Sequence, residues 1–347
     1  MRIVVYGTSR RVGALVGDQV IDLNRAFARY LRERRSASDP QAQADAHLPS
    51  DLEHLIARGT AALDDAREAL AYIQDNGATA DETEPRNSVQ LHAPTVYRPR
   101  IACAGANYVM HLVGTQAALR GEQISAEDAY RQARAAGPWG FWKVISDLCG
   151  DQDTVTYPAR AQLFDYEGEV AVVLGRRGTD IAASRATDYI WGVTLLNDWS
   201  IRNDMGPGRP LSFNLAKNFD TSVSVGPCIV VDEIDPQSVL VETHVNGELR
   251  QHYSSSEMTF KFDELLAFLS RDFTFLPGDM IAAGTGAGTA MDSSPRGPDG
   301  YASTDRFLKP DDDVQVSSPA IGALRNRVIA KAEVADSPGH QVAAGSR

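Results

Sequence analysis

Short apolar runs separated by turn-forming residues recur along most of this 347-residue chain. Runs of about four to eight apolar residues bounded by glycine, proline, asparagine or aspartate are typical of buried strands. The clearest runs lie at residues 101–105, 170–174, 189–196, 228–231 and 280–283. Helical spacing is confined to a few segments, at residues 23–33, 52–73, 125–137 and 262–270. The pattern predicts an α+β fold, mostly β, in which the larger part of the chain forms a mixed-sheet roll or barrel.

The first 95 residues contain no grouping of polar side chains that suggests chemistry. Three short strands are expected within residues 2–23, followed by a helix and then a polar loop that ends near Pro49. The next helical stretch is interrupted at Gly59, and residues 76–89 have the composition of a linker. We therefore expect three parts. They are a small N-terminal α/β domain over residues 1–95 that serves packing or dimerisation, a larger domain over 96–331, and a disordered polar tail over 332–347.

The composition, with 43% apolar and 23% charged residues, is that of an ordinary globular protein. The formal net charge of −12 and the lack of a basic cluster argue against a nucleic-acid partner. The three cysteines are scattered and lack metal-ligand spacing, which favours reduced thiols in a reducing compartment. No apolar stretch approaches about 18 residues and no signal peptide is evident, so we expect a cytoplasmic protein with no membrane partner.

Three acidic residues alternate immediately before the apolar run at 170–174: Asp165, Glu167 and Glu169. Side chains two residues apart on a strand share one face, with Cα atoms roughly 7 Å apart. Unpaired anions this close to a core strand are unfavourable unless they are protonated or neutralised. A hard divalent cation with oxygen ligands would neutralise them. The alternative is a solvated strand end with alternating charge.

A further acid, Asp198, ends the apolar run at 189–196, and three acids could meet if the two strands pair. His111 follows a strand that ends in Gly105, a position where loops present functional groups, although a lone histidine is more often structural. The glycine-rich segment 284–288 would expose backbone N–H groups to an anionic or carbonyl ligand. It lacks the Gly-Lys-Ser/Thr ending of a phosphate-binding loop.

Residues from about 98 to 328 resemble the fumarylacetoacetate hydrolase family, bacterial two-domain type. The likeness rests on an ordered set of segments: Gly105–His111, Phe141–Lys143, Asp165–Glu169, Asn197–Arg202, Lys217 with Asp220–Thr221, Gly226–Pro227, Pro277–Asp279, Gly284–Thr285 and Ile321–Asn326. Each segment alone is weak evidence, whereas the whole set in this order is specific. The resemblance implies the family's catalytic fold, the small strand-rich N-terminal domain that many members carry, and a homodimer.

The resemblance also assigns roles to individual residues. The expected ligands of a divalent cation are Glu167, Glu169 and Asp198. The resemblance favours Mg²⁺ for this cation, with Mn²⁺ or Ca²⁺ as alternatives. His111 matches the histidine that activates water or shuttles a proton, and Lys217 matches a catalytic lysine near the substrate oxygens. The expected substrate-binding residues are Arg202, Tyr108, Thr285 and Lys143.

Several positions depart from the family pattern. Bacterial members usually place a glutamate three residues after the histidine, where this chain has Gly114. The residues considered as an alternative partner for His111 are Glu122, Glu127, Asp292 and Asp305. Asn203 and Met205 also differ from the residues common in the family, and the loops at 112–140 and 289–306 are long.

The function implied by the resemblance is hydrolysis of a C–C bond in a β-diketone or acylpyruvate-type oxo acid, as in the catabolism of aromatic or sugar acids. The same site could run decarboxylation, hydration or dehydration, or isomerisation of a 2-oxo acid, none of which needs water to attack a ketone. A non-catalytic ligand-binding protein on this fold is the third reading. All three readings expect a small-molecule partner.

Overall fold

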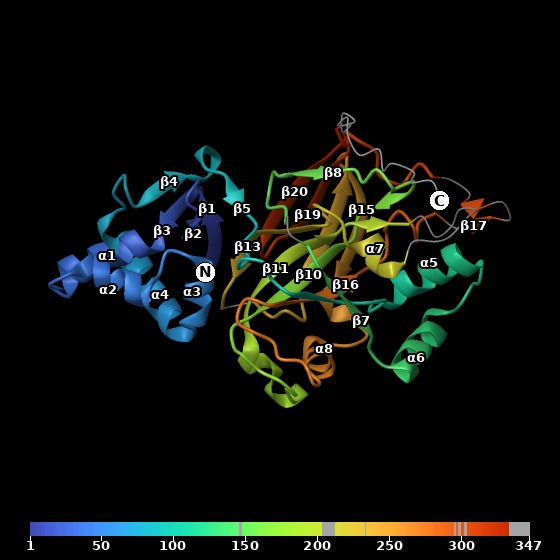
Figure 1. The fold of residues 1–347 in the computed structure, drawn as a ribbon, viewed down its shortest axis with the longest axis horizontal. Helices are drawn as coiled ribbons and strands as arrows, with labels where there is room; N and C mark the ends of the chain where they lie inside the picture. The colour runs from blue at the N-terminus through green and yellow to red at the C-terminus, as the bar shows by residue number, and fades with distance from the viewer. Residues whose placement is uncertain are drawn as a thin grey trace, which may run out of the picture.

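The computed structural model describes residues 1–145, 148–202, 212–232, 234–294, 296–297, 300–301 and 304–332. Two of the positions that depart from the family pattern, Asn203 and Met205, lie outside these ranges. Of the tail expected over 332–347, only Ala332 lies inside them. Figure 1 shows a smaller N-terminal unit in blue, built from strands and helices, beside a larger unit dominated by strands. No helix in the described ranges has both the length and the apolar character needed to span a bilayer.

The strands of the described residues form two large sheets. The first has eleven strands, and its path runs β4 (Thr83–Pro85), β3 (Gln19–Asp22), β2 (Arg11–Val16), β1 (Arg2–Tyr6), β13 (Val223–Val230), β11 (Ile190–Asp198), β10 (Gly168–Leu174), β16 (Met280–Thr285), β6 (Ile101–Ala104) and β7 (Gly140–Lys143), with β5 (Leu91–His92) beside β1. The second has five strands, in the order β15 (Glu248–Ser254), β14 (Leu240–Val245), β19 (Asp313–Ser318), β20 (Gly322–Ile329) and β8 (Thr154–Thr156). Two short ribbons pair β12 (Ser200–Ile201) with β9 (Phe164–Asp165), and β17 (Arg296–Gly297) with β18 (Gly300–Tyr301).

The helices are few in the larger unit. In the described residues they are α1 (Leu23–Arg34), α2 (Pro40–His47), α3 (Leu52–Ala57), α4 (Thr60–Asn76), α5 (Val109–Arg120), α6 (Ala126–Ala136), α7 (Phe213–Lys217) and α8 (Phe262–Leu269), with 3-10 turns η1 (Arg86–Ser88), η2 (Ala183–Tyr189) and η4 (Ser255–Glu257). The α+β, strand-rich class predicted from the sequence is confirmed. The large sheet runs from β4 to β7 without closing on itself, so within the described residues it is an open mixed sheet and not a closed barrel.

The N-terminal strands continue the sheet of the larger unit. Strand β1 pairs antiparallel with β13, with Arg2 opposite Val230 and Ile3 opposite Ile229. Ile3 and Ile229 also belong to one buried apolar cluster. A domain boundary at residue 95 therefore stays a prediction, because the two units share backbone hydrogen bonds as well as a core.

The expected polar loop before Pro49 is wrong in part, because residues 40–47 form α2. Its start is capped in the usual way: the Asp39 side chain accepts a hydrogen bond from the Ala42 N–H, and Pro40 occupies the first helical turn. The expected linker at 76–89 likewise contains β4, which pairs with β3. The helix over 126–136 is confirmed, with its N-cap at Ser125.

The two sheets enclose the main core, and this explains the unbroken apolar runs of the central strands. Side chains of β10 alternate between two clusters, as strand geometry requires. Val170 and Val172 pack with Val241 and Val316 of the second sheet. Ala171 and Val173 belong to the cluster on the opposite face. Residue 169 shares that opposite face, which places its carboxyl group away from the second sheet.

Candidate metal centre and active site

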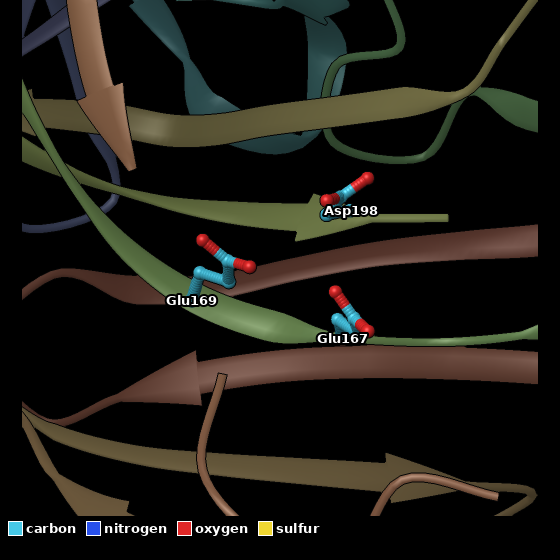
Figure 2. Close-up of side chains that lie close together, drawn as sticks. All are labelled: Glu167, Glu169 and Asp198. Atoms are coloured by element: carbon cyan, nitrogen blue, oxygen red, sulfur yellow. The ribbon is translucent and has the colours of Figure 1, made fainter. Parts of the chain in front are cut away.

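Three carboxylates meet where β10 begins and β11 ends. These strands are antiparallel neighbours, with Gly168 opposite Asn197 and Glu169 opposite Leu196. One carboxylate oxygen from each of Glu167, Glu169 and Asp198 lies within 4.8 Å of the others. Figure 2 shows the three side chains gathered in one region at the ends of these two strands. All three residues are buried, with relative exposures of 6%, 1% and 0%.

Two lysines and one arginine lie against these acids. The Nζ of Lys217, at the end of α7, donates to Glu167 Oε2 at 2.6 Å and to Asp198 Oδ2 at 2.9 Å. The Nζ of Lys143, on β7, donates to Asp198 Oδ1 at 2.6 Å. Arg202 forms an ion pair with Glu167 through Nη2. The structure therefore brings five of the predicted site residues into direct contact: Glu167, Asp198, Lys217, Arg202 and Lys143. Lys143 contacts a predicted metal ligand, and its role in substrate binding stays a prediction.

The Glu167 carboxyl has its pKa lowered. Burial alone would raise this pKa, but the positive charges of Lys217 and Arg202, with a smaller contribution from His111, outweigh it. Glu167 is therefore an anion held by cations that belong to the protein.

Glu169 is in the opposite situation. Within the described residues, no lysine, arginine or histidine lies within ion-pairing distance of its carboxylate, and its partner is the backbone N–H of Gly284 at 2.9 Å. Burial, followed by the charges of Asp198 and Glu167, raises its pKa well above the usual value. A buried anion without a counter-charge is strongly disfavoured. A hard divalent cation bound by carboxylate oxygens would provide that charge, so the donor set fits Mg²⁺, Mn²⁺ or Ca²⁺.

Asp165 shares the alternating pattern but does not join the other acids. Its oxygens accept hydrogen bonds from the backbone N–H groups of Ala290, at 2.7 Å, and Met291, at 3.2 Å. The same carboxylate accepts from Arg202 Nε at 3.1 Å. Asp165 thus holds Arg202, which in turn contacts Glu167, and this supporting role was missed in the sequence.

His111 lies in the first turn of α5 and is 7% exposed. Its Nδ1 is 2.8 Å from Asp292 Oδ2, so Asp292 is the sequence candidate for which the described residues show a contact with the ring. The other three, Glu122, Glu127 and Asp305, are exposed. The segment from 112 to 140, treated as a long loop in the sequence, is mostly the helices α5 and α6.

The remaining predicted substrate-binding residues line the same end of the sheet. Thr285 Oγ1 donates to the Gly168 carbonyl at 2.9 Å and accepts from Gln251 Nε2 at 2.7 Å. Gln251 also accepts the Gly168 N–H at 3.0 Å, so it fixes the backbone between the two glutamates. Gln251 lies on β15, which forms a hairpin with β14, and is only 1% exposed. The sequence pattern of this hairpin gave no indication that Gln251 belongs to the site. The hydroxyl of Tyr108 is buried and has no hydrogen-bond partner among the described residues.

The strand-rich α+β fold and this buried set of acids, lysines and a histidine define a protein with a candidate site for a divalent cation. Within that class, the chain belongs to the fumarylacetoacetate hydrolase family. The family model described as Fumarylacetoacetate (FAA) hydrolase C-terminal matches residues 100–329, which contain every predicted site residue.

Two relatives are similar over most of the chain. The human protein named Oxaloacetate tautomerase FAHD2B, mitochondrial, is 30% identical over 287 residues, covering 82% of this chain and 82% of the relative. Oxaloacetate tautomerase YisK of Bacillus subtilis (strain 168) is 32% identical over 287 residues, covering 81% of this chain and 87% of the relative.

Solved structures share the whole fold. Fumarylacetoacetate hydrolase from psychrophilic Exiguobacterium antarcticum has a TM-score of 0.69 and 26% identity, covering 95% of this chain and 100% of that one. Maleylpyruvate hydrolase from Sphingobium sp. SYK-6, in complex with manganese(II) ion and pyruvate, has a TM-score of 0.66 and 22% identity, covering 95% of this chain and 99% of that one. At that identity the second likeness concerns the fold alone.

Proposed function

We propose that this protein catalyses keto–enol tautomerisation of a small 2-oxo acid, with oxaloacetate as the first substrate to test. The observation that carries the proposal is the buried His111, which is held by Asp292 and lies close enough to the Glu167 carboxylate to interact with it electrostatically. Two relatives of 30% and 32% identity that bear the name oxaloacetate tautomerase support this choice of reaction.

Glu167, Glu169 and Asp198 would hold the divalent cation, for which Mg²⁺ is our first candidate and Mn²⁺ or Ca²⁺ the alternatives. When bound, such a cation supplies Lewis-acid polarisation of the 2-oxo group. The arrangement of backbone around the acids, fixed by Gln251 and the Gly284 N–H, keeps the carboxylates in place before substrate arrives.

Lys217 would stabilise the negative charge that develops on the 2-oxo oxygen. Within the described residues, two of its three ammonium hydrogens have partners, one on Glu167 and one on Asp198. The third is available to an oxyanion. The ammonium group is buried, and donors in a water-excluded site act more strongly on developing charge than donors in water.

His111 would move the proton. With Nδ1 bonded to Asp292, the Nε2 atom has no hydrogen-bond partner among the described residues and can accept a proton. It takes the proton from the carbon beside the ketone, and the C–H electron pair forms the carbon–carbon double bond of the enol. The carbonyl electrons pass to oxygen, and return of the proton to that oxygen completes the exchange.

Arg202, Tyr108 and Thr285 stay our candidates for binding the substrate. Arg202 is largely engaged by Asp165 and Glu167, so its share in binding the substrate would come from its remaining guanidinium hydrogens. The buried, unpartnered hydroxyl of Tyr108 is a natural donor to a substrate oxygen.

Hydrolysis of a C–C bond is the second candidate, and the contact between His111 and Asp292 favours it specifically. The sequence left open which of four acids partners the histidine, and Asp292 is the one for which the described residues show that contact. In hydrolysis the histidine would take its proton from water instead of carbon. Decarboxylation and hydration or dehydration use the same residues, whereas a purely ligand-binding role leaves the buried histidine–aspartate pair without a purpose.

The experiment is to remove metal from the purified protein, add back Mg²⁺ or Mn²⁺, and offer oxaloacetate and acylpyruvates separately. Loss of the enol absorbance together with NMR identification of products distinguishes the reactions. We expect faster exchange of enol and keto oxaloacetate with no change in composition. Two acid fragments would establish hydrolysis, and carbon dioxide would establish decarboxylation; either would replace the tautomerase proposal. No turnover by a metal-loaded protein would favour the ligand-binding reading.

The assembly and location of the protein also stay proposals. We propose a homodimer with a small-molecule substrate, without nucleic-acid or membrane partners, in the cytoplasm.

A further inference from the structure

Helix α5 packs directly on the turn that contains Asp292, and Gly114 is the contact point. A Cβ atom at residue 114 would lie 2.5 Å from the Asp292 Cβ, 3.1 Å from its carbonyl oxygen and 3.3 Å from its Cα. The nearest of these contacts is far shorter than real Cβ atoms show. A glycine inside a helix is less favourable than alanine by about 1 kcal/mol, so its presence here needs a packing reason. The side chain of Asp292, whose Cβ makes the nearest contact, is that reason.

His111 lies one helical turn before Gly114, so the two positions face the same side. A side chain at residue 114 would reach the imidazole, which is where the family pattern places its glutamate. In this chain the space belongs to Asp292 instead. Its carboxylate is 3% exposed and lies 2.8 Å from His111 Nδ1. Glycine at position 114 and aspartate at position 292 thus belong together: the carboxylate beside the histidine comes from residue 292 instead of residue 114.

The turn holds this carboxylate in a fixed orientation. The backbone N–H of Gly288 donates to both Asp292 oxygens, at 3.0 and 3.2 Å, and Ser293 Oγ contacts Oδ1 at 3.2 Å. Gly288 has a φ of +106° and its Cβ would lie 1.9 Å from the Arg250 carbonyl oxygen. Only glycine fits at residue 288, so the donor that orients Asp292 depends on it.

The same turn also supports the acid cluster. Its Ala290 and Met291 N–H groups bind Asp165, and Asp165 binds Arg202. Residues 288–292 therefore connect the position of the histidine to the position of Glu167. The late insertion is thereby a structural part of the site.

We infer that Asp292 is the positioning residue for His111, supplied by the 288–292 turn in place of an acid on α5, and that Gly114 makes room for it. An ionised carboxylate only accepts hydrogen bonds, so Nδ1 carries the proton and Nε2 is left as the base. The negative charge also stabilises the imidazolium that forms when Nε2 takes a proton. The inference rests on the proposed function for the histidine's role as base, and on the geometry alone for the pairing.

The first test is Asp292→Asn, which keeps the size of the side chain and removes its charge. We expect kcat on the oxo acid to fall by about 100-fold or more, with a much smaller change in KM. Binding of Mn²⁺ should be unchanged, because Asp292 contacts none of the three acids in the described residues. Asp311→Asn is the matched control, since Asp311 is exposed and has a φ of +79° that asparagine tolerates.

The second test is an exchange. Asp292→Gly alone should lose activity, and adding Gly114→Glu should restore at least about tenfold of it, as expected when a general base regains its partner. The exchange is feasible because the 2.5 Å contact is to the Asp292 side chain, and the remaining backbone contacts of 3.1 and 3.3 Å need shifts of only a few tenths of an ångström. If Asp292 only maintained the fold, a glutamate placed at position 114 on α5 would not restore the activity that Asp292→Gly loses.

The pairing has a readout independent of turnover. A hydrogen-bonded Nδ1–H gives a downfield proton NMR signal, which should be present in wild type and absent in Asp292→Ala and His111→Gln proteins. If the protein acts on no oxo acid but shows this signal, the proposed function fails and the pairing stands. If Asp292→Asn and Asp292→Gly turn over at the wild-type rate, or the signal survives in Asp292→Ala, the inference is overturned.

Discussion

Glu169 is the residue on which the cation assignment depends most. Glu167 and Asp198 already have lysine partners, whereas the described residues offer Glu169 only a backbone N–H. The family resemblance assigned the three acids as ligands, but neither it nor their spacing could predict this difference. The lysines reach the site from α7 and β7, far along the chain, and no local pattern shows which acid they will contact.

Glu169→Gln should weaken cation binding while leaving the metal-free fold intact. The amide oxygen can still accept the Gly284 N–H, and the change removes a buried charge that has no cationic partner. We expect Mn²⁺ affinity, measured by calorimetric titration, to fall about tenfold or more. Glu84→Gln on the exposed face of β4 is the control and should bind as wild type does. Equal Mn²⁺ affinity in the Glu169 variant would remove this residue from the site.

Lys143→Met should destabilise the metal-free protein. The ammonium and Asp198 are both fully buried, so removing Lys143 leaves Lys217 as the remaining cationic partner of Asp198 among the described residues. Breaking a buried ion pair typically costs about 3–5 kcal/mol, and the contact with Lys217 should place the loss at the lower end of that range. Urea unfolding in the absence of metal measures the loss, and saturating Mn²⁺ should recover part of it by supplying positive charge to Asp198. The exposed Lys309→Met is the control. A Lys143 variant as stable as wild type would show that this pair does not form.

At the scale of elements, the central strands were predictable because they are buried on both faces and therefore unbroken in apolar character. The hairpin at Asn246–Gly247 was predictable for a different reason. Asparagine followed by glycine favours the positive φ values that a tight hairpin turn requires, and both residues have positive φ here. Helix α5 was not, because its first turn carries His111 among apolar residues and Gly114 weakens its propensity. Only the contact with the 288–292 turn explains that glycine.

Gly288→Ala tests whether the 288–292 turn shapes the site. An added Cβ would meet the Arg250 carbonyl at 1.9 Å, so the turn must move and release Asp292. We expect a lower Tm together with a fall in kcat of about tenfold or more, as for a misplaced catalytic group. Gly247→Ala is the matched control: its φ is +80°, but its Cβ would meet nothing within 4 Å. The control should have a lower Tm and an unchanged kcat. If Gly288→Ala also lowers Tm without lowering kcat, the 288–292 turn does not contribute to catalysis.

For the whole molecule, composition predicted a globular fold with reduced cysteines, and in the part of the chain that the structure describes all three cysteines are buried and none forms a disulfide. What composition could not predict is that the N-terminal strands extend the sheet of the larger unit through β1 and β13. Such pairing joins residues more than two hundred positions apart. Strand patterns in a sequence identify strands but do not name their partners.

Buried thiols also make the stability of the whole fold sensitive to alkaline pH. Burial raises the pKa of Cys228 to about 12. In the unfolded chain a cysteine ionises near about 8.5, so above that pH the unfolded state binds fewer protons and stability falls as pH rises. Cys228→Ser, which can still donate to the Ile321 carbonyl, should lessen this fall between pH 8 and 10 by up to about 1.4 kcal/mol per pH unit. Urea unfolding at pH 8 and pH 10 measures this. If the free energy of unfolding falls equally in variant and wild type, the Cys228 thiol does not cause the pH dependence.

The central claim is that one divalent cation is held by three carboxylates at the ends of β10 and β11. The most direct measurement is anomalous X-ray diffraction from crystals of the protein equilibrated with Mn²⁺. We predict one strong anomalous peak within coordinating distance of oxygens from Glu167, Glu169 and Asp198. A well-diffracting crystal with no peak there, or with its manganese bound elsewhere, would contradict the account.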